Sequence, residues 1–163
     1  MRCPTWPDRR RPAEARRGAA AVELAVIALF LVLLVTGMVE LGRAVMVKTV
    51  LTDASRKGAA TGASWSKTYA DIQNDVDDIL ATDKQLPATL ANGKAHLVVS
   101  VARWDATTQT YGADTVVSAA TFAPSQYDKV SVKVWVNSSD VSWFFLNYLG
   151  GTVESETVVM MRQ

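Results

Sequence analysis

Hydrophobic positions divide the chain into one long apolar run and several shorter segments with regular periods. The run covers residues 19–39, and no charged side chain occurs between Leu24 and Val39. As an α-helix, this run would extend about 31 Å, close to the thickness of the hydrocarbon core of a bilayer. An amphipathic helix of a soluble protein would instead carry a polar stripe with a period of three to four residues. The pattern therefore predicts a transmembrane helix over residues 19–39.

The helical period continues after the apolar run. Val47, Leu51, Ala54 and Gly58 follow one another at spacings that place them on one helix face. This predicts a helical stalk over residues 40–63. The stalk is rich in small residues, which either let a sheet pack closely against it or allow contact with the helix of another subunit. These small residues are Ala54, Gly58, Ala59, Gly62 and Ala63.

The rest of the chain combines one helical pattern with several alternating ones. Apolar residues recur at helical spacing over residues 69–82. They alternate with polar residues over 97–101 and 130–136, as expected of strands, and a valine-rich segment at 153–161 predicts another strand. A long N-terminal helix packed on a small antiparallel sheet satisfies this order. The predicted fold class is α+β.

Local signals mark the connections between these elements. Asn92-Gly93 predicts a turn, and the polar stretch 107–112 predicts a loop. Asp140 is expected to cap a short helix that carries the aromatic residues of 143–149. This aromatic group fits either the core of the outer domain or a contact with another subunit or the membrane surface.

Basic residues are concentrated at the N-terminus. Residues 1–18 contain six arginines and two acidic residues, whereas the remainder contains 11 Lys and Arg against 14 Asp and Glu. Because Lys and Arg stay on the cytoplasmic side of a membrane span, the N-terminus is predicted in the cytoplasm and residues 44–163 outside the cytoplasmic membrane. A basic arm can also attract nucleic acid, but one that adjoins an apolar run is better explained by topology, so no nucleic acid partner is expected. The predicted organisation is a leader (1–18), a transmembrane helix (19–39), a helical stalk (40–63) and an extracytoplasmic α+β domain (64–163).

A cleaved secretory signal peptide is the main alternative for the apolar run. The apolar part of such a peptide is typically about 7–15 residues long and ends at a small-x-small cleavage site. The run at 19–39 is longer, and the nearest such site, Gly42-Arg43-Ala44, contains a charge. We therefore expect the helix to remain as an anchor.

Residues that carry enzyme chemistry are sparse. The single cysteine is Cys3, in the leader, and the single histidine is His96, expected at the surface. They cannot supply a His/Cys zinc site, and a Ser-His-Asp arrangement has little basis. Asp71, Asp75 and Asp78 lack the glycine and terminal glutamate of a calcium loop, so they are interpreted as a solvated helix face. The sequence therefore predicts that the protein is not an enzyme and that it has no catalytic residue, metal site or cofactor.

Glu23 is the one acidic residue inside the apolar run. A carboxylate costs about 2.5–3.5 kcal/mol near the middle of a membrane helix and less toward its end. Either Glu23 lies at the headgroup level and is tolerated there, or it has a cationic partner within the apolar zone. The second interpretation makes Glu23 a candidate functional residue.

Three short elements occur in order around the apolar run. The first is Arg16-Arg17-Gly18 followed by Ala19-Ala20-Ala21-Val22-Glu23-Leu24-Ala25. The second is Gly-Met-Val-Glu-Leu-Gly-Arg-Ala at 37–44, and the third is Ala-Ser-Arg-Lys-Gly-Ala-Ala-Thr-Gly-Ala at 54–63. Together they resemble the N-terminal region of the TadE-like pseudopilins, or minor pilins, of the tight-adherence (Tad, or Flp-type) pilus system. The matching family positions are Gly37, Glu40, Gly42, Arg43, Ala54, Arg56 and Gly58.

The resemblance implies a pilin-like fold and a role in the assembly of a pilus used in adhesion and secretion. It also implies that a membrane-embedded prepilin peptidase cuts between Gly18 and Ala19 on the cytoplasmic face. The new amino group of Ala19, with an ordinary pKa of about 8, would then lie near Glu23 of the same or an adjacent subunit. In an apolar setting these charges attract strongly, which gives Glu23 its partner. The implied partners are the peptidase, other pilin subunits, the Tad assembly platform and membrane lipid.

A second function remains open at this stage. The chain fits a single-pass, membrane-anchored extracytoplasmic binding module whose signal anchor is never cleaved. Both functions place the protein in the bacterial inner membrane, and a location within the pilus or at its base is also open. Cleavage of the leader distinguishes the two, because a simple anchor has no need of it.

Overall fold

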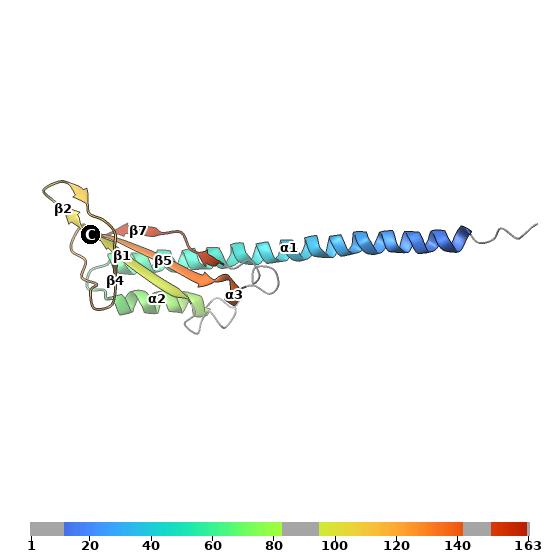
Figure 1. Ribbon diagram of the computed structural model, residues 1–163. Coiled ribbons are helices and arrows are strands. Elements are labelled where there is room, and N and C mark those ends of the chain that lie inside the picture. The colour runs from blue at the N-terminus through green and yellow to red at the C-terminus, as the bar shows by residue number, and fades with distance from the viewer. Residues whose placement is uncertain (1–11, 83–94, 142–150, 163) are drawn as a thin grey trace, which may run out of the picture. The chain divides into compact units, whose positions relative to one another are not determined.

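The computed structural model describes residues 12–82, 95–141 and 151–162. The chain forms two compact units, Met1–Val39 and Glu40–Gln163. Helix α1, Pro12–Ala63, contributes residues to both units (Figure 1).

Within the first unit, residues 18–39 form an apolar stretch of helix without a buried face. From Gly18 to Val39 the side chains are exposed, apart from the half-exposed Thr36. The Thr36 hydroxyl donates a hydrogen bond to Val32 O at 2.8 Å, one turn earlier. Its polarity is therefore satisfied within the helix, as a hydrocarbon environment requires.

In the second unit, the rest of α1 and helix α2, Tyr69–Thr82, form one layer. Val47, Leu51 and Ala54 on α1 are buried, which confirms the predicted inner face. Ile72, Val76 and Leu80 form the buried face of α2 at spacings of four residues, also as predicted. Each of these buried valine, leucine and isoleucine side chains contributes about 1.5–3 kcal/mol to the stability of the unit.

The N-terminus of α2 is closed by a capping box between Thr68 and Asp71. The Thr68 N–H donates to Asp71 Oδ2 at 2.7 Å, and the Asp71 N–H donates to Thr68 Oγ1 at 3.3 Å. These bonds satisfy two donors that the first turn of a helix would otherwise leave free. The hydrogen bond from the Thr68 backbone, followed by that from its hydroxyl, lowers the pKa of Asp71.

The second layer is an antiparallel sheet in the order β4-β1-β5-β6, with β7 also paired to β5. Strand β5 is central, because β1 pairs along one of its edges while β6 and β7 share the other. The strands are β1 His96–Ala102, β4 Thr115–Val117, β5 Lys129–Asn137, β6 Thr152–Glu154 and β7 Val158–Met161. The predicted α+β fold, a long N-terminal helix followed by a small antiparallel sheet, is confirmed.

Both helices pack on the same face of this sheet. Val130, Val132, Val134 and Val136 of β5 are fully buried in one cluster with residues of α1, α2 and β1. The intervening residues of β5 face the other side, where Ser131 is buried, Lys133 and Trp135 are half-buried, and Lys133 forms an ion pair with Glu154 of β6 at 2.5 Å. The alternation predicted for 130–136 is thus an alternation between the fully buried valines of the core and the residues of the opposite sheet face.

The predicted loop at 107–112 is wrong in part. Residues Thr110–Tyr111 form strand β3, which pairs with β2, Trp104–Asp105. Asp105 Oδ1 accepts the N–H of Thr107 at 2.8 Å and so closes the turn between the two strands. The Trp104 and Tyr111 rings pack 4.8 Å apart, which supplies the apolar contact that this short hairpin needs.

The segment predicted as a strand over 153–161 is interrupted. The chain leaves the ladder at Ser155–Thr157 and divides into β6 and β7. Ser155 remains close to β5, since its N–H donates to Val134 O at 2.8 Å and its hydroxyl accepts the Val134 N–H at 3.0 Å.

The predicted cap at Asp140 is also misplaced. Helix α3, Ser138–Val141, begins before Asp140, which lies in its first turn. Ser138 at the start of the helix donates both its N–H and its hydroxyl to Gly151 O, at 3.0 and 2.9 Å. The predicted turn at Asn92-Gly93 and the aromatic residues of 143–149 lie outside the described residues.

Candidate functional site

The predicted processing junction lies inside a helix. Because α1 begins at Pro12, the peptide bond between Gly18 and Ala19 has helical neighbours on both sides. Among the described residues, a β-carbon added at Gly18 would meet no atom within 4 Å, so their packing does not require glycine there. Glycine lowers the stability of a helix by about 1 kcal/mol relative to alanine, which eases local unwinding at this bond.

Glu23 lies one helical turn after Ala19, and its side chain is exposed. Four residues correspond to about 6 Å along the helix axis. Side chains on an α-helix lean toward its N-terminus, so the Glu23 carboxylate is directed toward the turn that contains Ala19. Ala19 and Glu23 therefore lie one turn apart on the same exposed side of α1, a spacing compatible with the proximity that the family resemblance implies.

The family positions around the end of the apolar run belong to different units. Gly37 lies in the first unit, whereas Glu40, Gly42 and Arg43 lie in the second. Glu40 is only 8% exposed and Arg43 is half-buried, and neither is without a partner. A β-carbon added at Gly37 or Gly42 would meet no atom within 4 Å.

The third family element packs into the second unit. Ala54 is completely buried, and a β-carbon added at Gly58 would lie 2.9 Å from Val76 Cγ2 of α2 and 3.3 Å from Val132 Cγ1 of β5. Arg56 has the opposite orientation, since its exposed guanidinium is 3.4 Å from Asp53 Oδ1. This element therefore helps to hold α1 against the sheet.

Gly62 repeats the arrangement of Gly58. A β-carbon there would lie 2.8 Å from Val130 Cγ1 and 3.0 Å from Ile72 Cδ1. Of the two interpretations of the small residues, close packing against the sheet is the correct one at Gly58 and Gly62. Both positions are buried within a single copy of the chain and are closed to another subunit.

Of the acidic residues predicted to form a solvated face of α2, Asp78 is exposed, whereas Asp71 and Asp75 are half-exposed and accept hydrogen bonds. The Thr61 hydroxyl of α1 donates to Asp75 Oδ2, and Asp71 belongs to the capping box. Burial raises the pKa of Asp77. Over the described ranges 12–82, 95–141 and 151–162, no group of three or more His, Cys, Asp or Glu side chains is arranged to hold a metal ion.

His96 lies at the surface, as predicted. Its side chain is exposed and its ring stacks on that of Trp135, with the centroids 4.0 Å apart.

Sequence analysis missed two polar residues that join distant parts of the second unit. Ser55 Oγ of α1 lies 2.7 Å from Ser155 Oγ, one hundred positions later in the chain. Asp128 is 2% exposed, and its two carboxylate oxygens accept the N–H groups of Trp104 at 2.9 Å and Ser125 at 2.7 Å. A single Ser or Asp has no periodicity, so the sequence carried no signal for either residue.

The apolar helix has a composition suited to a membrane. In the part of the chain that the structure describes, one helix is long and apolar enough to cross a bilayer. Its large hydrophobic side chains from Val22 to Val39 are exposed. A patch of this size on a soluble monomer would promote association, whereas lipid covers it without cost.

Comparison with known proteins gives one result. The family model described as TadE-like protein matches residues 18–60. The match begins at Gly18, contains Glu23, and covers all the family positions from Gly37 to Gly58. No curated protein and no solved structure matches the chain. The N-terminal region of the chain is thus TadE-like, as its residues predicted.

Proposed function

We propose, on the premise of this TadE-like region, that the protein is a minor pilin or pseudopilin that acts in the assembly of a tight-adherence type pilus. The observation that carries the proposal is the coincidence of the family match with an apolar helix that has no buried face. Such a helix needs a hydrocarbon environment, which a bilayer provides before assembly and neighbouring subunits provide afterwards. In this role the protein is a substrate and a building element and performs no catalysis itself.

Maturation is part of the proposal. The arginines of the leader hold the N-terminus in the cytoplasm, where a prepilin peptidase of the inner membrane cleaves after Gly18. Cleavage creates an amino group on Ala19, one turn from Glu23. The resulting ion pair neutralises two charges that would each be costly in the apolar zone. A subunit with a neutral N-terminal end can then move from lipid into contact with other pilin subunits and the Tad assembly platform.

The alternative, a binding module with a permanent anchor, makes no use of Glu23 or of cleavage. The family match favours the pilin role, because it begins at Gly18 and includes both residues of the predicted cut and the carboxylate one turn later.

The experiment that tests the proposal replaces Glu23 with Gln in a strain that makes the cognate pilus. The unpaired amino group left in the apolar zone costs about 3 kcal/mol, so we expect loss of pilus production at a normal level of membrane-inserted protein. Glu23→Asp should restore production only in part, because its carboxylate is one methylene shorter.

The matched control is Glu156→Gln, the same chemical change at an exposed residue of the second unit. It should leave pilus production unchanged. Normal production with Glu23→Gln at a normal protein level would contradict the proposed role of this carboxylate.

A further inference from the structure

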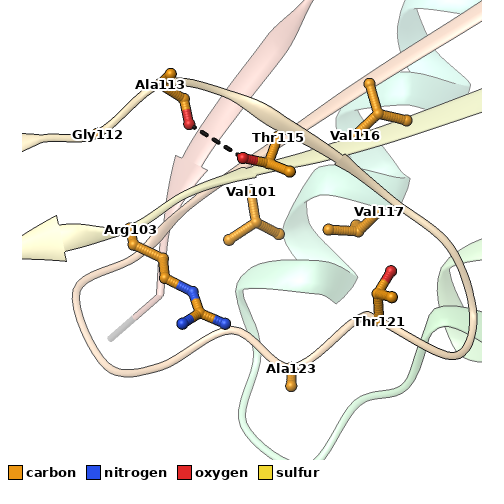
Figure 2. A pocket seen from close by; sticks show the side chains of 9 residues that line it. All are labelled: Val101, Arg103, Gly112, Ala113, Thr115, Val116, Val117, Thr121 and Ala123. Carbon is orange, nitrogen blue, oxygen red and sulfur yellow. Dashed lines mark hydrogen bonds between the residues drawn. The ribbon is translucent and has the colours of Figure 1, made fainter.

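The second unit contains a pocket of about 380 Å³ beside strands β1 and β4 (Figure 2). Val101 and Val117 form its apolar floor, and the register of the two strands places both on the same face of the sheet. Ala113 and Ala123 add to the apolar lining, while Arg103, Thr115 and Thr121 supply polar groups. Apolar walls with a few polar groups, at this volume, are typical of sites for small ligands.

The wall of the pocket after β4 is held by its own hydrogen bonds. Ser118 N–H donates to Thr121 Oγ1 at 2.8 Å, and the N–H groups of Thr121 and Phe122 donate to Ser118 O at 3.0 and 2.9 Å. The next residue, Phe122, packs edge-to-face with Tyr69 of α2, at 6.2 Å between ring centroids. A wall fixed in this way requires little ordering when a ligand binds, which favours affinity.

Arg103 gives the pocket its charge. Its backbone carbonyl is engaged by the Gly112 N–H at 2.9 Å, and its guanidinium extends below Val101 toward Ala123 (Figure 2). Within the described ranges, this guanidinium has no hydrogen bond or ion pair. By contrast, Lys133 is paired with Glu154, and the Arg162 guanidinium donates to Pro124 O at 3.0 Å.

The chemistry of the pocket defines the ligand. A guanidinium presents a planar fork of N–H donors that matches a carboxylate. The Thr115 hydroxyl donates to Ala113 O only at 3.4 Å, so it can turn to a stronger acceptor. The apolar floor between Val101 and Val117 suits a short aliphatic group and disfavours a second charge.

We propose that this pocket binds a short aliphatic carboxylate, with the carboxylate on Arg103 and the aliphatic group between Val101 and Val117. The C-terminal residue of a peptide and a free small acid both have this chemistry. The site goes beyond the proposed role in pilus assembly, since neither Glu23 nor the leader takes part in it.

The test uses the full chain in nanodiscs of zwitterionic lipid, with valine methyl groups labelled for NMR. Three probes are titrated: acetyl-Ala-Val with a free carboxylate, its C-terminal amide, and isovalerate. We expect the carboxylate peptide to shift the methyl resonances of Val101 and Val117 and to leave those of Val134, in the core, unchanged. Isovalerate binding as tightly as the peptide identifies a free acid as the ligand, and peptide binding alone identifies a C-terminus.

Two variants distinguish specific binding at Arg103 from a non-specific attraction of anions to the protein. Arg103→Gln should weaken binding about tenfold or more, because a charge-assisted pair with a carboxylate is lost. Lys57→Gln, which removes an exposed cation from α1, should leave it unchanged. The Val134 resonances report that each variant is folded. Equal binding of the amide and the carboxylate, no effect of Arg103→Gln, or no shift with any carboxylate would overturn the proposal.

Discussion

Glycine serves two different purposes along α1. At Gly58 and Gly62 an added β-carbon would lie 2.9 and 2.8 Å from valine methyl groups of the core. At Gly37 and Gly42 it would meet open space. The first pair is required by the packing of a single chain, whereas no contact among the described residues requires glycine at the second pair.

Gly58→Ala should therefore destabilise the second unit by about 1–2 kcal/mol. Overpacking a core costs about 1–3 kcal/mol, and the higher helix propensity of alanine offsets up to about 1 kcal/mol of it. Thermal unfolding of the membrane-reconstituted protein, followed by near-UV circular dichroism, measures the difference. Gly42→Ala is the matched control, with the same gain in propensity and no clash, so its Tm should be unchanged or higher. A Gly58→Ala protein as stable as Gly42→Ala would contradict the packing described for α1.

Elements of the second unit that are distant in sequence are joined by a chain of polar contacts. Ser55 of α1 meets Ser155 at the break between β6 and β7, and Ser155 in turn accepts the N–H of Val134 in β5. All three residues are buried, so each lost partner leaves a polar group without water to replace it. The break between β6 and β7 therefore places Ser155 where it links helix α1 to strand β5 by hydrogen bonds.

Ser155→Ala should cost about 1–3 kcal/mol, because the buried Val134 N–H loses its acceptor. Hydrogen exchange at the Val134 amide should accelerate by a corresponding factor. Ser55→Ala should cost less, since Ser155 keeps its bonds to Val134 and to Glu156 O. A larger loss of stability with Ser55→Ala than with Ser155→Ala would contradict this order of contributions.

Elements with a strong local period were predictable from the sequence. The inner face of α1, the helix at 69–82 and the strand at 130–136 each repeat an apolar residue at the period of their secondary structure. Gly18, Ala19 and Glu23 were singled out by their resemblance to family residues, and their roles stay predictions. The hairpin of β2 and β3 was not predictable, since its turn is closed by the side chain of Asp105 and its strands contain two residues each.

The parts of the fold that depend on contacts across the chain were also beyond prediction. Strands β6 and β7 both pair with the same edge of β5. The local sequence pattern of a strand does not specify which strand edge it pairs with. The pocket depends on the register between β1 and β4. The contact between Ser55 and Ser155 depends on how α1 packs against the sheet.

At the scale of the whole molecule, charge and hydrophobicity are arranged along the chain in a fixed order. Six arginines precede the apolar helix, and the residues after position 18 carry more acidic than basic side chains. By the positive-inside rule, this order predicts a cytoplasmic N-terminus. The account of maturation requires that orientation, because the peptidase must reach Gly18 from the cytoplasmic face.

The second unit should accordingly lie outside the cytoplasm. Alkaline phosphatase fused to the C-terminus should be active, and a reporter that works only in the cytoplasm should be inactive at the same position. Replacing the six leader arginines with glutamine should increase the inverted fraction. Activity of the cytoplasmic reporter on the wild-type protein would refute the orientation.

The central claim is that the chain is a pilin-like subunit matured by removal of its leader. Intact-mass and N-terminal analysis of the membrane-extracted protein, from cells that contain the cognate prepilin peptidase, tests it most directly. The account predicts a mature chain that begins at Ala19, and retention of residues 1–18 when Gly18 is replaced by Val while insertion into the membrane is unchanged. A wild-type protein that keeps its leader, or one that begins near Val45, would contradict it.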